Sequence, residues 1–86
     1  MIKVLLVDDH QLVRAGIRRI LDDAEDIEVC GEAGSGEEAL KQVKQTRPEV
    51  VLMDVNMPGI GGLEATRKLL RLDESLKIIA LTVHVD

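Results

Sequence analysis

Short apolar runs alternate with longer segments of mixed character along this chain. Three runs, 2–7, 50–53 and 77–82, are apolar apart from Lys3, Lys77 and Thr82, which is typical of strands buried on both faces. Residues 27–30 instead alternate between apolar and polar side chains, as a half-exposed strand at a sheet edge does. The pattern therefore predicts four strands, of which all but the second are buried.

Between these strands, apolar residues recur at intervals of three and four, which predicts three amphipathic helices. The first covers 11–23, and its predicted inner face consists of Val13, Ile17, Ile20, Leu21 and Ala24. The second begins after Ser35, which forms a capping-box pattern with Glu38, and ends near Thr46 ahead of Pro48. The third follows a glycine-rich loop, and its predicted inner face consists of Leu63, Thr66, Leu69 and Leu70.

Strands and helices thus alternate from the first strand to the fourth, with short connections. This order is typical of an α/β fold, a parallel sheet with right-handed crossovers and helices on its faces. We expect a single domain over residues 1–86. The chain stops just after a predicted strand, where an alternating fold is expected to continue, so the domain looks truncated.

Charge and composition narrow the function. The formal net charge is −5 and the chain has no Phe, Tyr or Trp, which argues against a nucleic-acid surface. No apolar stretch approaches the ~20 residues that span a bilayer, and no signal or transit peptide opens the chain, so we expect a cytoplasmic protein. The one cysteine, Cys30, cannot form an internal disulfide and reads as a small buried apolar residue.

Acidic residues follow two of the predicted strands. Asp8 and Asp9 come directly after the first, and Asp54 ends the third. Carboxyl ends of parallel strands meet at one edge of a sheet, so we expect these carboxylates to converge. Their mutual repulsion favours a divalent cation, and Mg²⁺ prefers oxygen ligands. An aspartate can also accept a phosphoryl group, and Thr82 ends the fourth strand where its hydroxyl could contact one.

Simpler interpretations exist for each residue alone. Asp8 and Asp9 could cap the first helix, and Asp54 could be a turn residue. A calcium loop starting at Asp54 is excluded, because Pro58 occupies a ligand position. His10 beside the acidic pair either tunes the site or lies at the surface.

Three motifs in this order resemble the receiver domain of bacterial two-component response regulators: VDDH at 7–10, LMDVNMPG at 52–59 and LT at 81–82. The stretches LVRAGIRRIL at 12–21 and MPGIGGLEATR at 57–67 are similar to the GacA/UvrY-type regulators, which carry a helix-turn-helix output domain. The resemblance covers the whole chain. It implies a flavodoxin-like, CheY-like doubly wound sheet with strand order 2-1-3-4.

The resemblance also implies roles for individual residues. Asp54 corresponds to the phosphoacceptor, which receives its phosphoryl group from a sensor histidine kinase in the presence of Mg²⁺. Asp9 and Asp54 correspond to direct metal ligands, Asp8 to a ligand through water, and Asn56 to a backbone-carbonyl ligand. Thr82 corresponds to the hydroxyl that turns toward the phosphoryl group. Such a domain is a signalling module and not a metabolic enzyme, and it controls transcription through a DNA-binding domain that is absent here.

Departures from the family leave an alternative open. The family's fourth helix, fifth strand with its lysine and aromatic switch residue, and fifth helix all lie beyond these 86 residues. Their absence should expose apolar surface of the first and third strands and favour a homodimer or strand-exchanged oligomer. The alternative function is a phosphorylation-incompetent dimerisation or kinase-docking fragment. An aspartyl phosphohydrolase is disfavoured, because Asn56 stands where such enzymes need a second aspartate.

Overall fold

The computed structural model describes residues 1–55 and 61–81. Strands and helices alternate as predicted, and the four strands pair in parallel in the order β2-β1-β3-β4. The strands are β1 (Ile2–Val7), β2 (Ile27–Ala33), β3 (Val50–Asp54) and β4 (Lys77–Leu81). The helices are α1 (Gln11–Asp22), α2 (Gly36–Thr46) and α3 (Gly61–Leu72). The predicted α/β fold and strand order are thus confirmed.

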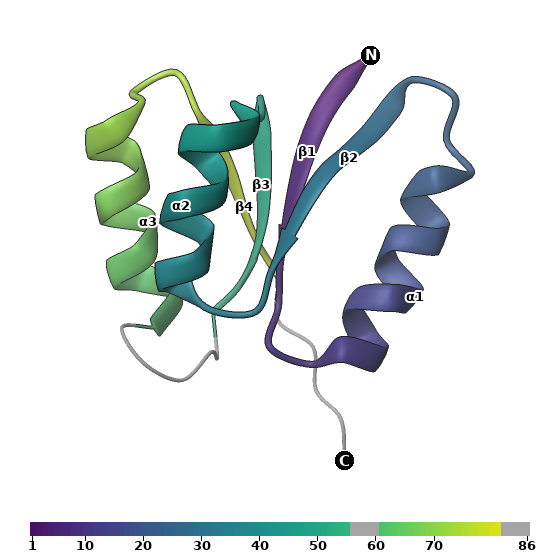
Figure 1. The fold of residues 1–86 in the computed structure, drawn as a ribbon, viewed down its shortest axis with the longest axis horizontal. Helices are drawn as coiled ribbons and strands as arrows, with labels where there is room; N and C mark the ends of the chain where they lie inside the picture. Colours follow the sequence, from purple (N-terminus) through teal and green to yellow (C-terminus); the bar gives the residue numbers. More distant parts are fainter. Residues whose placement is uncertain (56–60, 82–86) are drawn as a thin grey trace.

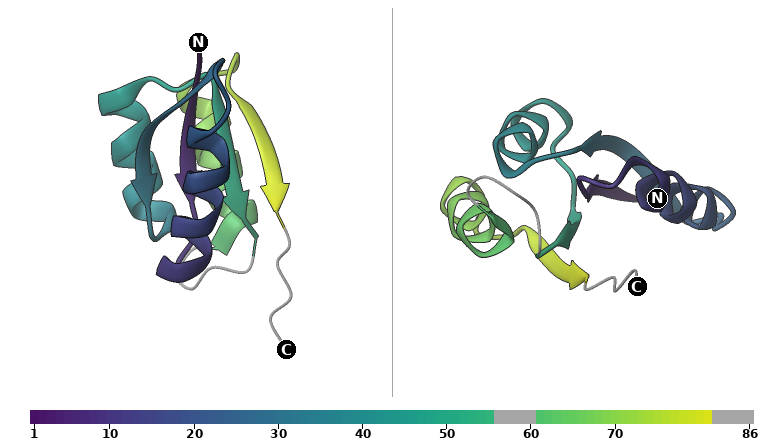
Figure 2. Two further views of the ribbon diagram at one scale, coloured as in Figure 1. Left: turned by 90° about the vertical axis from the view of Figure 1, so that its right-hand side faces the viewer. Right: turned by 90° about the horizontal axis from the view of Figure 1, so that it is seen from below.

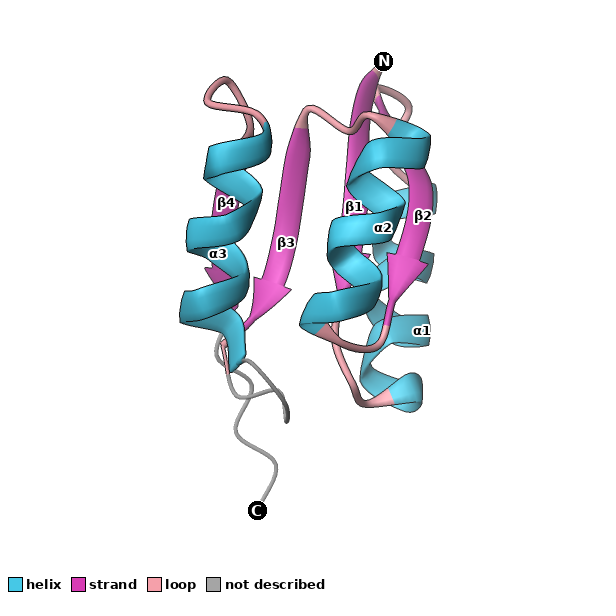
Figure 3. Cartoon of the chain, turned by 60° about the vertical axis from the view of Figure 1, so that its left-hand side comes forward, coloured by secondary structure: helices cyan, strands magenta, loops and turns pink. Residues whose placement is uncertain are grey.

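Helices cover the two faces of the sheet unequally. Helices α2 and α3 lie side by side on one face, whereas α1 alone lies on the other, next to β1 and β2 (Figures 1 and 2). Figure 3 shows α2 and α3 in front of the sheet and α1 behind it. Right-handed crossovers place successive helices in this way.

The hydrophobic core fills the space between the sheet and the α2–α3 layer. Alternate residues of the two central strands point into it, and Leu5, Val51 and Met53 are fully buried. The rest of this core consists of Val7, Ala33, Ala39, Val43, Ala65, Leu69 and Leu76. The ends of β1 and β3 are therefore held by close-packed side chains.

Two local predictions for α2 are confirmed. Ser35 is its N-cap, and the Ser35 Oγ accepts a hydrogen bond from the backbone N–H of Glu38 at 3.1 Å. The helix ends at Thr46, and Arg47 closes it in the left-handed conformation with φ 49°.

The predicted faces of the other two helices are partly wrong. In α3 the buried residues are Gly62, Ala65 and Leu69, whereas Leu63 is 77% exposed. The true face is centred on small residues, which let α3 approach the sheet and α2 closely. In α1 no residue is buried, and Ile20 is 71% exposed, because the described residues place no second helix beside α1 on its face of the sheet.

The predicted burial of β4 is also wrong. Ile79 is 51% exposed, because α3 covers only one face of β4 and the other face has no cover among the described residues. Ala80, which points to the opposite face of the strand, is exposed as well.

The prediction that β1 exposes apolar surface holds only at the first residue of the strand, because Ile2 is 41% exposed whereas Val4 and Leu6, which alternate with the core residues of β1, are buried on the side of α1. In β3, Leu52 is partly exposed. Among the described residues, large exposed apolar side chains thus lie mainly on α1, α3 and β4.

Strand β2 lies at the sheet edge, as predicted, but runs three residues beyond the predicted 27–30. A register shift between Val4 and Leu5 of β1 leaves Cys30 of β2 out of the pairing. The Cys30 thiol is only partly buried and donates a hydrogen bond to the Val4 carbonyl oxygen at 3.4 Å. None of the described helices is long and apolar enough to cross a membrane.

Leucines on the two sides of α3 provide a direct test of its orientation. Replacing the fully buried Leu69 by alanine should lower the free energy of unfolding by ~2–5 kcal/mol, because it leaves a cavity in the core. The same change at the exposed Leu63 should cost less than ~0.5 kcal/mol. Urea unfolding followed by circular dichroism measures both, and equal losses would contradict the described orientation of α3.

Candidate functional site

The carboxyl ends of β1 and β3 bring the predicted acidic residues together. Val7 pairs with Met53 across the two strands, so the next residues, Asp8 and Asp54, lie side by side. One side-chain ligand atom from each of Asp8, Asp9, His10 and Asp54 lies within 4.8 Å of all the others. The predicted convergence of three carboxylates is therefore observed.

Burial differs among these carboxylates. Asp8 and Asp54 are 1% and 4% exposed, whereas Asp9 is partly exposed. Removing an ionised carboxylate from water is costly unless it is paired or bound to a cation. Packing alone does not explain why two aspartates are buried side by side at the ends of these strands. The pair is therefore a candidate functional site.

The backbone of Asp8 is held from both sides. Its N–H donates to the Ala33 carbonyl oxygen at 3.0 Å, and its own carbonyl oxygen accepts from Arg14 Nη1 at 2.7 Å. Arg14 also donates through Nε to Glu32 Oε1 at 3.0 Å. One guanidinium therefore joins α1, β2 and the end of β1, and it restricts where the Asp8 carboxylate can lie.

Arg14 and Glu32 are the site residues that the sequence interpretation missed. Arg14 lies outside the apolar face that the sequence predicts for α1, yet its side chain is only 17% exposed. Arg18 pairs with the same Glu32 carboxylate and with Asp22, one turn away on α1. The sequence did contain a signal for this contact. It was an arginine one turn after the acidic pair, together with a glutamate near the end of an edge strand.

His10 lies at the cluster and not away from it. Its Nδ1 is 3.0 Å from Asp9 Oδ1, 3.3 Å from Asp8 Oδ1 and 4.0 Å from Asp54 Oδ2. His10 is also the N-cap of α1, without a side-chain capping bond, so the alternative in which Asp8 or Asp9 takes that position is wrong. Asp8 Oδ1 instead accepts from the His10 backbone N–H at 2.8 Å.

The carboxylates fit a bound cation. Asp8 Oδ2 is buried and accepts no hydrogen bond from the described residues, and Asp9 Oδ1 lacks one of good geometry although it is close to His10. Orphaned carboxylate oxygens are costly unless a cation or water satisfies them. These oxygens of Asp8 and Asp9, with the Asp54 carboxylate beside them, match the oxygen donors that Mg²⁺ takes. Asn56 and Thr82 lie outside the described residues, so their predicted roles stay predictions.

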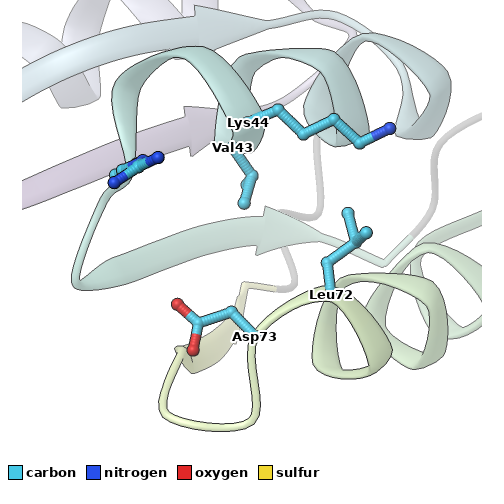
Figure 4. Close-up of a pocket in the computed structure, with 5 residues that line it drawn as sticks. Val43, Lys44, Leu72 and Asp73 are labelled. Carbon is cyan, nitrogen blue, oxygen red and sulfur yellow. The ribbon is translucent and has the colours of Figure 1, made fainter.

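A groove lies at the end of the sheet opposite to the acidic residues. It has a volume of about 480 Å³ and runs between the last turns of α2 and α3 (Figure 4). Its lining consists of Val43, Lys44, Arg47, Leu72 and Asp73. Hydrogen bonds from the Ser75 hydroxyl and backbone N–H hold the pKa of Asp73 below its ordinary value. The side chains that line this groove carry charges of both signs and form no cluster of metal ligands. We therefore take the acidic residues at the carboxyl ends of β1 and β3 as the candidate functional site.

Helix α3 approaches the end of β3 so closely that only glycine fits. A Cβ at Gly62 would lie 2.6 Å from Val55 Cα and 2.9 Å from the Asp54 carbonyl oxygen. Gly62→Ala should therefore displace the Asp54 backbone and lower the free energy of unfolding by more than ~1 kcal/mol. Gly16→Ala on α1 is the matched control, since its Cβ would meet no described atom within 4 Å, and it should stabilise by ~0.5–1 kcal/mol. Chemical denaturation checks both signs.

Arg14 and Arg18 both pair with Glu32. Comparing variants of the two arginines distinguishes the support of Asp8 from surface ion pairing. Arg14→Gln leaves the Asp8 carbonyl oxygen without its Nη1 donor and should cost ~1–3 kcal/mol of unfolding free energy. Arg18→Gln removes partly exposed ion pairs only and should cost less than ~1 kcal/mol. Amide hydrogen exchange at Asp8 should quicken in the first variant and not in the second. Equal effects would show that Arg14 acts only through Glu32.

Known proteins share this sequence and this fold. The sequence profile of the response regulator receiver domain matches residues 4–86. The response regulator GacA of Pseudomonas syringae pv. syringae is 61% identical over 96% of this chain, and UvrY of Escherichia coli K12 is 63% identical over all of it. The chain spans 39% of the length of each of these relatives.

Solved structures agree with the sequence matches. A LuxR-family two-component response regulator from Aurantimonas sp. SI85-9A1 superposes with a TM-score of 0.90 at 38% identity, over 96% of this chain and 59% of that one. The isolated receiver domain of RcsB from Salmonella enterica serovar Typhimurium, solved with the phosphomimetic BeF3−, gives 0.88 at 30% identity, over 99% and 64%. With its acidic residues at the strand ends, this chain belongs to the family of response regulator receiver domains of two-component systems.

Proposed function

We propose that this receiver domain is a phosphoacceptor and that Asp54 takes the phosphoryl group. The observation that carries the proposal is the position of Asp54. Its carboxylate is almost fully buried at the carboxyl end of β3, with Asp8 and Asp9 beside it. An aspartate with a restricted orientation next to a candidate cation site has what a carboxylate nucleophile needs.

The proposed step is a transfer between two side chains. A carboxylate oxygen of Asp54 forms a bond to phosphorus while the bond from phosphorus to a histidine nitrogen of a sensor kinase breaks. The electron pair of that bond stays on the leaving imidazole, which then takes up a proton. The product is an acyl phosphate on Asp54, so the chain is itself the substrate and acts as a signalling component and not as a metabolic enzyme.

Asp8, Asp9 and Asp54 are the residues that would hold Mg²⁺, with the Asn56 carbonyl as a further ligand. Bound there, the ion supplies charge neutralisation between the acceptor carboxylate and the phosphoryl oxygens. The chain's own contribution is positional. Arg14 and Ala33 hold the Asp8 backbone, and Gly62 admits α3 close to the end of β3.

The proposal extends to the regulation of transcription by a protein that contains such a domain. Relatives are response regulators, and RcsB of Salmonella enterica serovar Typhimurium has been solved bound to a promoter in the presence of BeF3−. By analogy, phosphorylation at Asp54 would shift the domain between two conformations and so regulate a DNA-binding output domain. Thr82 is proposed as the hydroxyl that contacts the phosphoryl group. A homodimer or strand-exchanged oligomer formed through exposed apolar surface stays a prediction.

Intact mass after incubation with Mg²⁺ and a small acyl phosphate donor tests the acceptor. The protein should gain one phosphoryl group, and Asp54→Asn should gain none, because the amide cannot attack phosphorus. Asp73→Asn, which changes a carboxylate at the other end of the sheet, is the matched control and should gain one group like the unmodified protein.

The negative result is equally informative. A protein that stays folded by circular dichroism, binds Mg²⁺ and gains no mass would contradict the proposal. The dimerisation or kinase-docking alternative would then become the better account of this chain.

A further inference from the structure

His10 adds a nitrogen donor to a cluster that otherwise offers only oxygen. Its Nδ1 lies 3.0, 3.3 and 4.0 Å from oxygens of Asp9, Asp8 and Asp54, one oxygen on each residue. The other side of the ring is open, since the side chain is 60% exposed. The imidazole thus faces the carboxylates through Nδ1 while most of the ring stays in solvent.

These separations match the spacing of ligands around one metal ion. At metal–ligand distances of ~2.1 Å, adjacent ligands of an octahedron lie ~3.0 Å apart and opposite ligands ~4.2 Å apart. The three nitrogen–oxygen distances fall within or close to that range. A metal ion between the four groups would bind the Nδ1 lone pair and offset the repulsion among the three carboxylates.

A separate feature points to a ligand at the same place. Asp8 Oδ2 is buried and accepts no hydrogen bond from the described residues, although Oδ1 of the same carboxylate accepts one from the His10 backbone N–H. The cluster therefore has an unsatisfied oxygen as well as the facing imidazole nitrogen. Proteins rarely leave such an atom without a partner.

The added nitrogen changes which metals the cluster favours. Mg²⁺ takes oxygen ligands and gains little from an imidazole, whereas late first-row transition metals bind imidazole well. We propose that His10 Nδ1 is a direct ligand, with Asp8, Asp9 and Asp54, of a late first-row divalent metal ion, which this cluster binds more tightly than Mg²⁺. The inference rests on the proposed function, in that the phosphoacceptor site and this metal site share their carboxylates.

Calorimetric titration of the tag-free protein with Ni²⁺ and, separately, with Mg²⁺ at neutral pH tests the inference. His10→Gln should weaken Ni²⁺ binding by about 10- to 100-fold, the range seen when a metal site loses a supporting group. Mg²⁺ affinity should change less than about 2-fold, because the oxygens remain. Asp73→Asn, which removes a carboxylate at the opposite end of the sheet, is the control and should alter neither affinity.

Each outcome bears on one proposal. If His10→Gln leaves Ni²⁺ affinity unchanged or raises it, the ring is no ligand and at most a charged neighbour, and this inference is overturned while phosphorylation of Asp54 can still hold. If Asp54→Asn alters binding of neither metal, the shared carboxylate site fails instead. A second readout, the ¹⁵N chemical shift of His10 Nδ1 on adding Zn²⁺, should move strongly if that atom is bound to the metal and stay in place if it is not.

Discussion

The electrostatic cost of placing carboxylates together at one strand edge is the constraint on which this domain depends. Strands β1 and β3 pair in parallel, and the pairing of Val7 with Met53 sends the next residue of each strand, Asp8 and Asp54, to the same point. Both side chains are buried, so their repulsion is poorly screened by solvent. A rigid hydrophobic core holds the two strand ends in place, and the proposed cation would offset the repulsion.

The sheet is closely packed on one face and partly uncovered on the other. Between the sheet and the α2–α3 layer the core is close-packed, and Leu5 and Met53 of the central strands are inaccessible to solvent. Across the sheet, α1 shields β1 but leaves Ile79 of β4 half exposed. The acidic site thus lies at the end of the best-packed strands, where its geometry is least free to relax.

Polar contacts, in addition to packing, position the acidic residues. Arg14 connects α1 to β2 through Glu32 and reaches the Asp8 carbonyl oxygen, so the helix that follows the acidic pair also positions it. His10, the N-cap of the same helix, faces all three carboxylates through Nδ1. Orientation of the site therefore depends on α1, the helix with the least buried surface.

The sequence by itself determined the order of the elements, the parallel sheet, the cap at Ser35 and the convergence of Asp8, Asp9 and Asp54. These depend on neighbouring residues and on a topology with few alternatives, and motif resemblance added the strand order. The tertiary structure alone decided the rotation of α3 that buries Ala65 and exposes Leu63, and the exposure of β4. It also decided the Arg14–Glu32 contact, which spans 18 residues. Such features depend on which surfaces meet in space, and periodicity along one segment does not contain that information.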